Sequence, residues 1–198
     1  METIMNKGIK NILNLFYNNQ NEKFHLREIS RKTNLNENSV TRFLNKLEKA
    51  KLIKSKKRAN LKEYSISKNK KLYSIFNLFD LEKYNSLPME RKQAIEYFIK
   101  KLENQPLITL LFGSTAKNNF REDSDIDLLL ITNGKINLKK AKDFSESQTG
   151  IKISSFQISF EEFKEELKLK KDKVIQSAIE TGYPIENSIK FYSEVLNE

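Results

Sequence analysis

The run from Leu110 to Ile131 constrains this chain most, because it joins an apolar strand, a Gly-Ser turn and a second strand that begins with two aspartates. Gly113 allows the backbone to approach a phosphate closely, and Ser114 can donate a hydrogen bond to one. Asp125 and Asp127 are separated by one residue, so both carboxylates leave the same face of a strand. The pattern therefore predicts a site that holds a triphosphate against a divalent metal such as Mg²⁺.

An ordinary strand-turn-helix with an acidic strand entry is the alternative interpretation of this run. The two aspartates lead directly into residues 128–131, Leu-Leu-Leu-Ile, which are apolar enough to be buried on both faces of a sheet. Like charges this close repel one another unless a cation joins them. The alternative therefore explains the two aspartates poorly.

The same segment resembles the signature of the DNA polymerase beta-like nucleotidyltransferases, and within them the small minimal nucleotidyltransferases. That signature is Gly-Ser, ten residues and then Asp-x-Asp, and here ten residues separate the Gly-Ser at 113–114 from the Asp-Ile-Asp at 125–127. The resemblance implies a small α+β domain, a short mixed sheet flanked by helices, that uses Mg²⁺ or Mn²⁺ and takes ATP or another nucleoside triphosphate as substrate. The residues it assigns are Gly113, Ser114, Lys117 and Arg121 for phosphate, and Asp125 and Asp127 for metal binding and catalysis. Lys117 or Arg121 alone could equally be a solvated surface residue.

The third metal-binding acid of this family has no counterpart in the sequence. The family places that acid on the third strand of the core, and laying residues 153–163 on the pattern puts Ser154 where an aspartate is usual. No Asp or Glu lies in the segment 151–159. Because a neutral serine is a poor metal ligand, two interpretations stay open: an active transferase, or a domain that binds nucleotide and metal without efficient turnover.

Composition limits the class of protein. The 198 residues can form one medium domain or two small ones, and 38% hydrophobic with 31% charged residues fits a soluble globular chain. No apolar stretch approaches a membrane span and the N-terminus lacks the apolar core of a signal peptide, so we expect a cytoplasmic protein with no membrane partner. The chain has no cysteine and one histidine, His25, which argues against disulfides, a cysteine zinc site or a histidine metal site.

Positive charge is concentrated in the first half of the chain. Residues 1–86 contain 19 Lys and Arg against 8 Asp and Glu, a net charge of +11, whereas residues 87–198 contain 17 against 18, a net charge of −1. The excess therefore lies entirely in the first half. This asymmetry predicts two modules, of which the first binds a polyanion.

The basic half shows the element order of a winged helix-turn-helix. The expected elements are helices over 7–18 and 26–33, a third helix that Asn36 or Asn38 caps and that runs to about Ala50, and strands over 52–58 and 63–67 around a basic tip. The segments 26–30 and 40–53 resemble the winged-helix domains of prokaryotic regulators. We therefore predict a winged helix-turn-helix domain over residues 1–68.

In that geometry the third helix lies in the major groove of double-stranded DNA. Its Asn and Arg side chains can pair with base edges, and Lys and Arg on the wing can meet phosphates. The candidate nucleic-acid-binding residues are Asn38, Ser39, Thr41, Arg42, Asn45 and Lys46 on the helix and Lys56, Lys57, Arg58 and Lys62 on the wing. Winged helices also serve as protein or RNA modules, and surface lysines often contact only solvent, so these alternatives stay open. A homodimer that reads paired half-sites is a further expectation.

The rest of the sequence divides into a connection and a second domain. Residues 69–88 combine an apolar helix over 69–81 with a break at Pro88, and residues 89–198 form the predicted transferase domain. The expected elements of that domain are helices over 89–103 and 139–148 and another from 161, with strands over 107–112, 125–132 and 150–159. A helix that ends at Gly182 before a short strand resembles the closing segment of small transferases of this family. The whole chain is thus expected to be mixed α+β.

Two functions from different classes fit these observations. The first is a metal-dependent transferase that moves AMP from ATP onto a protein or RNA hydroxyl supplied in trans. The resemblance includes antitoxins that modify a partner toxin with a HEPN domain, and enzymes that modify antibiotics. The second is a DNA-binding transcriptional regulator whose transferase-like domain binds nucleotide with little or no turnover, which Ser154 favours. The two can coexist in an autoregulating protein, and a scaffold that joins two inert folds is the third interpretation.

Overall fold

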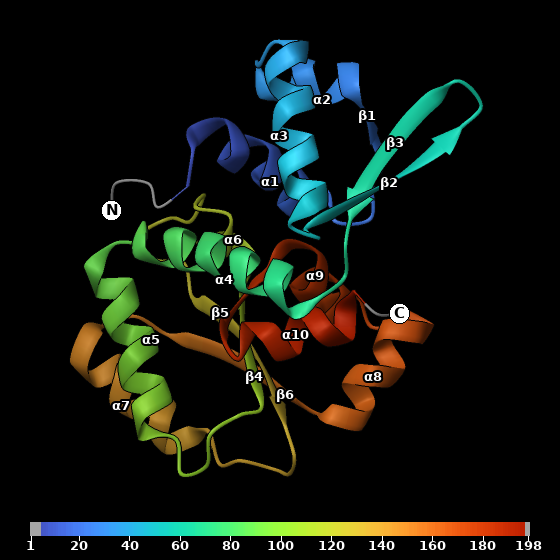
Figure 1. Ribbon diagram of the computed structural model, residues 1–198. Helices are drawn as coiled ribbons and strands as arrows, with labels where there is room; N and C mark the ends of the chain where they lie inside the picture. Colours follow the sequence, from blue (N-terminus) through green and yellow to red (C-terminus); the bar gives the residue numbers. More distant parts are fainter. Residues whose placement is uncertain (1–4, 197–198) are drawn as a thin grey trace. The chain divides into compact units, whose positions relative to one another are not determined.

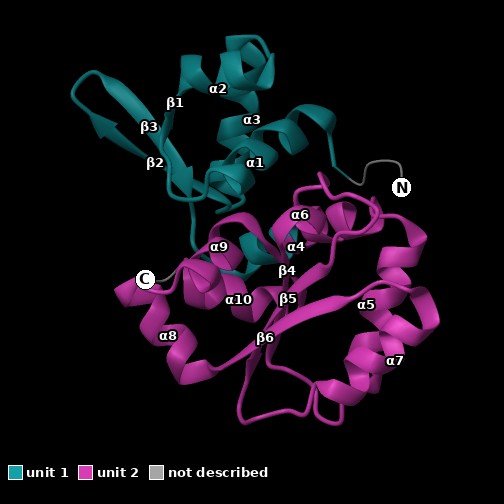
Figure 2. Ribbon diagram, turned by 180° about the vertical axis from the view of Figure 1, so that it is seen from behind, with its two compact units in different colours: residues 1–76 teal, residues 77–198 magenta. Residues whose placement is uncertain are grey.

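The computed structural model describes residues 5–196, and the chain divides into two compact units, residues 1–76 and 77–198 (Figures 1 and 2). The division lies inside helix α4 (Lys70–Asn85), which corresponds to the apolar helix expected over 69–81 and extends beyond it. Each unit combines helices with a small sheet, so the predicted mixed α+β class is confirmed. Among the described residues, no helix has both the length and the apolar character needed to cross a membrane.

Unit 1 contains three helices and a three-stranded antiparallel sheet with strand order β1-β3-β2. Its elements are α1 (Lys7–Asn18), β1 (Phe24–His25), α2 (Leu26–Thr33), α3 (Glu37–Lys49), β2 (Ile53–Arg58) and β3 (Leu61–Ile66). The three helices and the hairpin were expected. The hairpin is tighter than predicted, because Arg58 already pairs with Leu61 across a turn at Ala59 and Asn60. Strand β1 was not predicted, since two residues carry no detectable periodicity.

Helix α3 begins and packs as its sequence predicts. The side chain of Asn36 accepts a hydrogen bond from the backbone N–H of Ser39 (2.8 Å), which caps the helix. The buried side chains recur at helical spacing and are Val40, Phe43, Leu44 and Leu47. Phe43 lies so close to Gly8 of α1 that a Cβ on Gly8 would be 2.4 Å from the ring. This packing fixes the orientation of α3 and turns its polar face outward.

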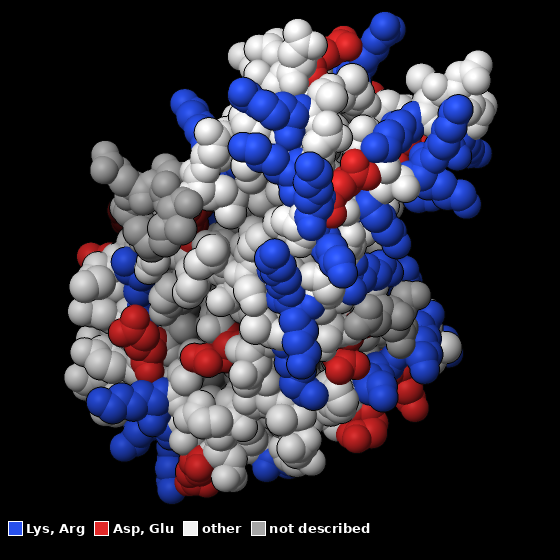
Figure 3. Space-filling view, in the orientation of Figure 1, with Lys and Arg blue, Asp and Glu red and all other residues white. Residues whose placement is uncertain are grey.

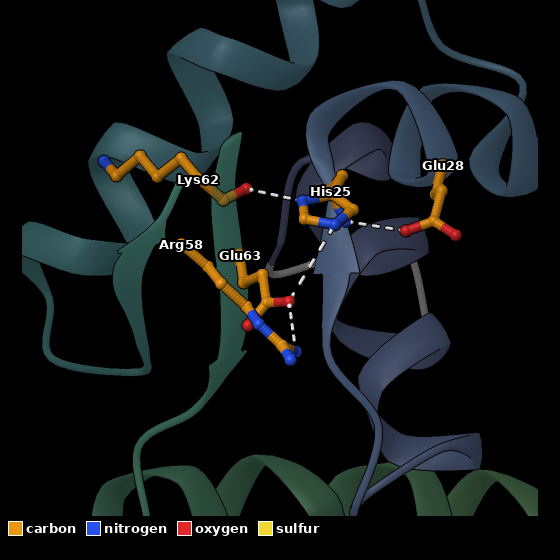
Figure 4. Close-up of polar contacts among 5 residues, drawn as sticks. All are labelled: His25, Glu28, Arg58, Lys62 and Glu63. Atoms are coloured by element: carbon orange, nitrogen blue, oxygen red, sulfur yellow. Dashed lines mark hydrogen bonds and ion pairs between the residues drawn. The ribbon is translucent and has the colours of Figure 1, made fainter. Parts of the chain in front are cut away.

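The single histidine joins the helices of unit 1 to the hairpin (Figure 4). The backbone N–H of His25 donates to the carboxylate of Glu28 (2.8 Å) at the start of α2. The ring Nδ1 lies 3.2 Å from the carbonyl oxygen of Lys62. The ring Nε2 lies 3.9 Å from Glu63, whose carboxylate is also 3.6 Å from the guanidinium of Arg58. His25 therefore has a structural role where β1 leads into α2.

Unit 2 is built on a mixed four-stranded sheet with strand order β6-β5-β4-β7. Its strands are β4 (Ile108–Phe112), β5 (Ile126–Thr132), β6 (Ile153–Ser159) and β7 (Tyr183–Glu186). Its helices, besides its share of α4, are α5 (Met89–Lys101), α6 (Gly113–Ala116), α7 (Lys139–Thr149), α8 (Phe160–Leu169), α9 (Lys173–Thr181) and α10 (Ser188–Val195). Strand β5 runs antiparallel to β4 and parallel to β6. The short mixed sheet and the strand after Gly182 were both expected.

The two faces of β5 explain its unbroken apolar run. Ile126, Leu128 and Leu130 belong to a core shared with α5 and α7 on one side of the sheet. Leu129 and Ile131 alternate with them and are also fully buried. Helices α8, α9 and α10 lie on that second side (Figures 1 and 2). The second side is open at the start of β5, where Asp125 is exposed and Asp127 is half-buried.

Candidate functional site

The close approach of Gly113 to Asp127 organises the candidate site. Strand β4 ends at Phe112, which is paired with Asp127 on β5, and the chain turns into the short helix α6 at Gly113. Gly113 has a φ of +70°, in the left-handed region that glycine occupies without strain. A Cβ at this position would lie 2.0 Å from Oδ2 of Asp127. Glycine is therefore required here, both by the backbone conformation and by the neighbouring carboxylate.

Asp125 and Asp127 are two carboxylates of like charge close to one another. Burial raises the pKa of the Asp127 carboxyl above its ordinary value, and the nearby charge of Asp125 raises it further. A hydrogen bond with the side chain of Ser154 acts in the opposite direction but does not cancel these effects. A bound divalent cation would neutralise the pair.

Ser154 occupies the position facing Asp127 on the neighbouring strand. The parallel register of β5 and β6 pairs Asp127 with Ser154, and the two side chains are hydrogen-bonded. Among the described residues, no group of three acidic, histidine or cysteine side chains could hold a metal ion. The protein ligands available near Gly113 are therefore two carboxylates, with a hydroxyl beside them.

These two carboxylates fit a divalent metal ion whose remaining ligands come from water and substrate phosphates. Carboxylate oxygens are hard ligands, and Mg²⁺ commonly takes one or two of them and completes its octahedron with water and substrate phosphates. Burial, and after it the nearby charge of Asp125, raises the pKa of Asp127, and a bound cation would oppose both effects. The site thus suits a metal-bound phosphate better than it suits a closed, all-protein metal centre.

A buried arginine, which sequence reasoning missed, holds the loop between α6 and β5. Arg91 of α5 is only 3% exposed, and its guanidinium donates to Oγ1 of Thr115 (2.9 Å) and to the carbonyl oxygens of Arg121 (2.9 Å) and Ser124 (3.0 Å). The same guanidinium lies 3.9 Å from the ring centroid of Phe120. Burial lowers the pKa of Arg91. One side chain therefore connects α6 to the segment that leads into the aspartates.

The sequence did contain a signal for Arg91. The residue precedes Ala94, Ile95 and Phe98 at helical spacing, so it belongs to the buried stripe of α5 rather than to its solvent face. An arginine on an apolar stripe indicates a buried guanidinium that needs hydrogen-bond acceptors. Its main acceptors are loop carbonyls, however, and these leave no pattern in a sequence.

The other predicted phosphate-binding residues lie on the same loop. Ser114 is half-buried in α6, beside Gly113. Lys117 is exposed at the end of α6, and the exposed Arg121 lies further along the loop, where its backbone N–H donates to Oγ of Ser124 (2.9 Å). The fold therefore brings Gly113, Asp127 and Ser154 together closely. Lys117 and Arg121 lie on the solvent-facing side of the loop.

The second set of predicted residues lies in unit 1. Lys and Arg side chains gather along α3 and the β2–β3 hairpin (Figure 3). A shallow hollow on the exposed face of α3 is lined by Asn38, Thr41, Arg42, Asn45, Lys46 and Lys49. Five of these six were predicted, and Lys49, one helical turn beyond Asn45, was not. Ser39 is half-buried beside this face.

The candidate residues of the β2–β3 hairpin differ in whether their charges contact other side chains of unit 1. Lys56 and Lys57 are exposed on β2. Lys62 instead lies 3.0 Å from the carboxylate of Glu48 and 5.0 Å from the ring centroid of Tyr64, and the hydrogen bond to Glu48 raises its pKa. The charge of Lys62 is thus partly neutralised by Glu48 within unit 1. The charge of Arg58 is also shared, with Glu63.

The segment that holds this site matches a known protein family. Residues 92–182 match a family model described as Polymerase beta, Nucleotidyltransferase. The match contains Gly113, Asp125, Asp127 and Ser154 and supports the predicted nucleotidyltransferase family. Unit 2 therefore carries a C-terminal nucleotidyltransferase domain. Because the match stops short of half the chain, it describes this domain and not the whole protein.

Likeness to individual proteins is weak. The search of curated proteins found no significant match. One matching solved structure is of a mutant of Lactococcus lactis ZitR, with 20% sequence identity, a match over 50% of this chain and 73% of that chain, and a TM-score of 0.30. At that TM-score the likeness supports no conclusion.

Proposed function

We propose that the nucleotidyltransferase domain transfers a nucleoside monophosphate, with AMP from ATP as the first candidate, onto a protein or RNA hydroxyl supplied in trans. The observation that carries the proposal is the close approach of Gly113 to Asp127, which brings an open backbone turn against a carboxylate that could hold a metal ion. A turn for phosphate and a carboxylate for metal are useful together only when the ligand is a metal-bound phosphate. A HEPN-type toxin is one acceptor that this proposal includes.

The chemistry follows from the residues around the turn. Asp125 and Asp127 would hold Mg²⁺ or Mn²⁺, which orients the triphosphate and neutralises its charge when bound. Gly113 and Ser114 would bind phosphate oxygens through the turn. The acceptor hydroxyl oxygen forms a bond to the α-phosphorus while the bond from that phosphorus to the bridging oxygen breaks, and pyrophosphate leaves. The neutral Ser154 cannot take the hydroxyl proton, so that proton passes to substrate phosphate or solvent and turnover is expected to be slow.

A label-transfer assay tests this proposal. The purified protein is incubated with Mg²⁺ or Mn²⁺, each α-labelled nucleoside triphosphate in turn, and either a total RNA pool or a cell lysate as acceptor. We expect label in a discrete band that the Asp125→Asn/Asp127→Asn variant does not produce. Absence of transfer with both metals and all four nucleotides would contradict the transferase.

We also propose that residues 1–68 form a winged helix that binds double-stranded DNA through α3 and the hairpin. The hollow on α3 combines Asn38 and Asn45, which can pair with base edges, with Arg42, Lys46 and Lys49. Unit 1 as a whole has 18 Lys and Arg against 6 Asp and Glu. A charge balance of this kind supports binding to phosphates.

The runner-up function is a DNA-binding regulator whose transferase-like domain senses nucleotide. The hydroxyl of Ser154 opposite Asp127 favours it, because an acid is missing where the chemistry needs one. Electrophoretic mobility shifts with a promoter fragment, with and without Mg-ATP, distinguish the two. A shift that responds to nucleotide in a protein that transfers no label supports the regulator. The proposal includes a cytoplasmic location, because ATP is available there.

A further inference from the structure

An exposed aromatic ring lies on the strand that carries Ser154. Phe156 of β6 is 45% exposed, although strands of this sheet otherwise bury most of their large apolar side chains. Its ring centroid is 6.4 Å from that of Phe112 at an interplanar angle of 51°, and Phe112 is only 6% exposed. Phe156 is thus supported by a buried ring on one side and accessible on another.

The strand registers place these two rings beside the candidate metal site. Phe112 pairs with Asp127, and Asp127 pairs with Ser154, so these three residues form one row across the sheet. Phe156 follows Ser154 by two residues on the same face, a separation of about 7 Å along a strand. The rings therefore meet over β5, on the face from which the Asp127 carboxylate projects.

A planar aromatic ligand fits this surface. A triphosphate held by Gly113 and Asp127 carries a sugar and a base that must lie somewhere within one nucleotide's length of the aspartates. Every nucleobase has a π-face that stacks on an aromatic side chain. A phenylalanine offers no hydrogen bond with which to distinguish one base from another, so any preference among bases would come only from the area of the stacked ring.

We propose that Phe156, backed by Phe112, is the stacking surface for the base of the nucleotide bound at Gly113 and Asp127. This inference rests on the proposed function, because it takes the triphosphate site as given. Phe156 and Phe112 would bind the base, which the Gly-Ser turn and the aspartates do not contact. Purine nucleotides bind more tightly than pyrimidine nucleotides at such a surface, because the larger ring system stacks over more area.

The absence of tryptophan from the chain permits a direct optical test. A Phe156→Trp variant carries a single indole at the proposed surface. We expect Mg-ATP to quench or shift its fluorescence, and Mg-tripolyphosphate, which has the phosphates without the base, to leave the spectrum nearly unchanged. A Phe144→Trp variant is the matched control, because Phe144 is a partly exposed ring on α7, packed against Tyr97, and α7 covers the opposite side of the sheet. Its fluorescence should not respond to either ligand.

A second variant separates this inference from the proposed function. Phe156→Leu should weaken Mg-ATP binding about tenfold by losing the stacked ring, and should leave Mg-tripolyphosphate binding at its original affinity. Unchanged tripolyphosphate binding also shows that the variant is folded. If the natural protein binds both ligands and Phe156→Leu changes neither affinity, the stacking surface is wrong while the phosphate site stands. If the natural protein binds neither ligand, the proposed function fails together with this inference.

Discussion

The backbone of Gly113 lies against the carboxylate of Asp127, so closely that a Cβ would approach Oδ2 to 2.0 Å. A Gly113→Ala substitution must therefore displace Asp127 or open the turn, in addition to placing alanine at a φ of +70°. A displacement of about 1 Å can cost about 100-fold in rate, and we expect a loss of that size in label transfer. Gly134→Ala is the matched control, because nothing lies within 4 Å of a Cβ there. Equal activity of the two variants would contradict the site.

Arg91 should support the site without touching the substrate. A lysine at this position has one donor nitrogen, whereas the guanidinium uses Nη1 for Thr115 and Nη2 for both loop carbonyls, so lysine cannot reproduce the three hydrogen bonds at their observed geometry. We expect Arg91→Lys to lower the free energy of unfolding by about 1–3 kcal/mol, the cost of a buried polar group left unpaired, and to raise the KM for nucleotide. Thermal unfolding and initial-rate kinetics measure both effects. Thr115→Val removes only one of the three hydrogen bonds and should have a smaller effect, and an Arg91→Lys variant that matches the natural protein would exclude the supporting role.

Introducing an acid at position 154 should strengthen the proposed chemistry. Ser154 is paired with Asp127, so a carboxylate in its place would complete a three-acid site and supply a proton acceptor. We expect Ser154→Asp to raise the label-transfer rate about 100-fold, the range in which a general base contributes. Without metal, a third negative charge beside Asp127 should lower the melting temperature, and Mg²⁺ should recover it. Ser154→Asn is the neutral control, and equal rates in the two variants would argue against a missing base.

DNA binding should depend on the exposed face of α3. An Arg42→Ala/Lys46→Ala variant removes two positive charges from the hollow on that helix. We expect weaker DNA binding and a smaller dependence of the affinity on salt, with the slope reduced by about 1 for each phosphate that the variant can no longer neutralise. Fluorescence anisotropy with labelled duplex DNA at several salt concentrations measures this. Lys168→Ala/Lys171→Ala removes the same charge from exposed positions of unit 2 and should leave DNA affinity unchanged.

Local pattern was enough to predict the elements that carry the site. The apolar run of residues 128–131 indicated a strand buried on both faces, as observed. Gly113 and Asp127 were proposed as site residues from the Gly-Ser turn, the paired aspartates and the resemblance to the nucleotidyltransferase signature, and the structure brings the two residues together. The buried face of α3 followed in the same way from the 3.6-residue period of its apolar positions.

Contacts between residues that are far apart in the sequence could not be predicted from local patterns. The parallel register that sets Ser154 against Asp127 and brings Phe156 near Phe112 depends on strand order, which no local period encodes. The role of Arg91 depends on backbone carbonyls at 121 and 124, which have no sequence signature. The pairing of Lys62 with Glu48 joins the hairpin to α3 and changes what that lysine can offer to DNA.

The central claim is that Asp125 and Asp127 hold a metal-bound triphosphate beside Gly113. Isothermal titration of ATP into the protein, first with Mg²⁺ and then with a chelator, tests it most directly. We predict binding that requires Mg²⁺ and that weakens by at least about 100-fold in the Asp125→Asn/Asp127→Asn variant, because loss of the outer-shell partners of a metal site alone costs about 10–100-fold. ATP binding of equal affinity without metal, or unchanged in that variant, would contradict the claim.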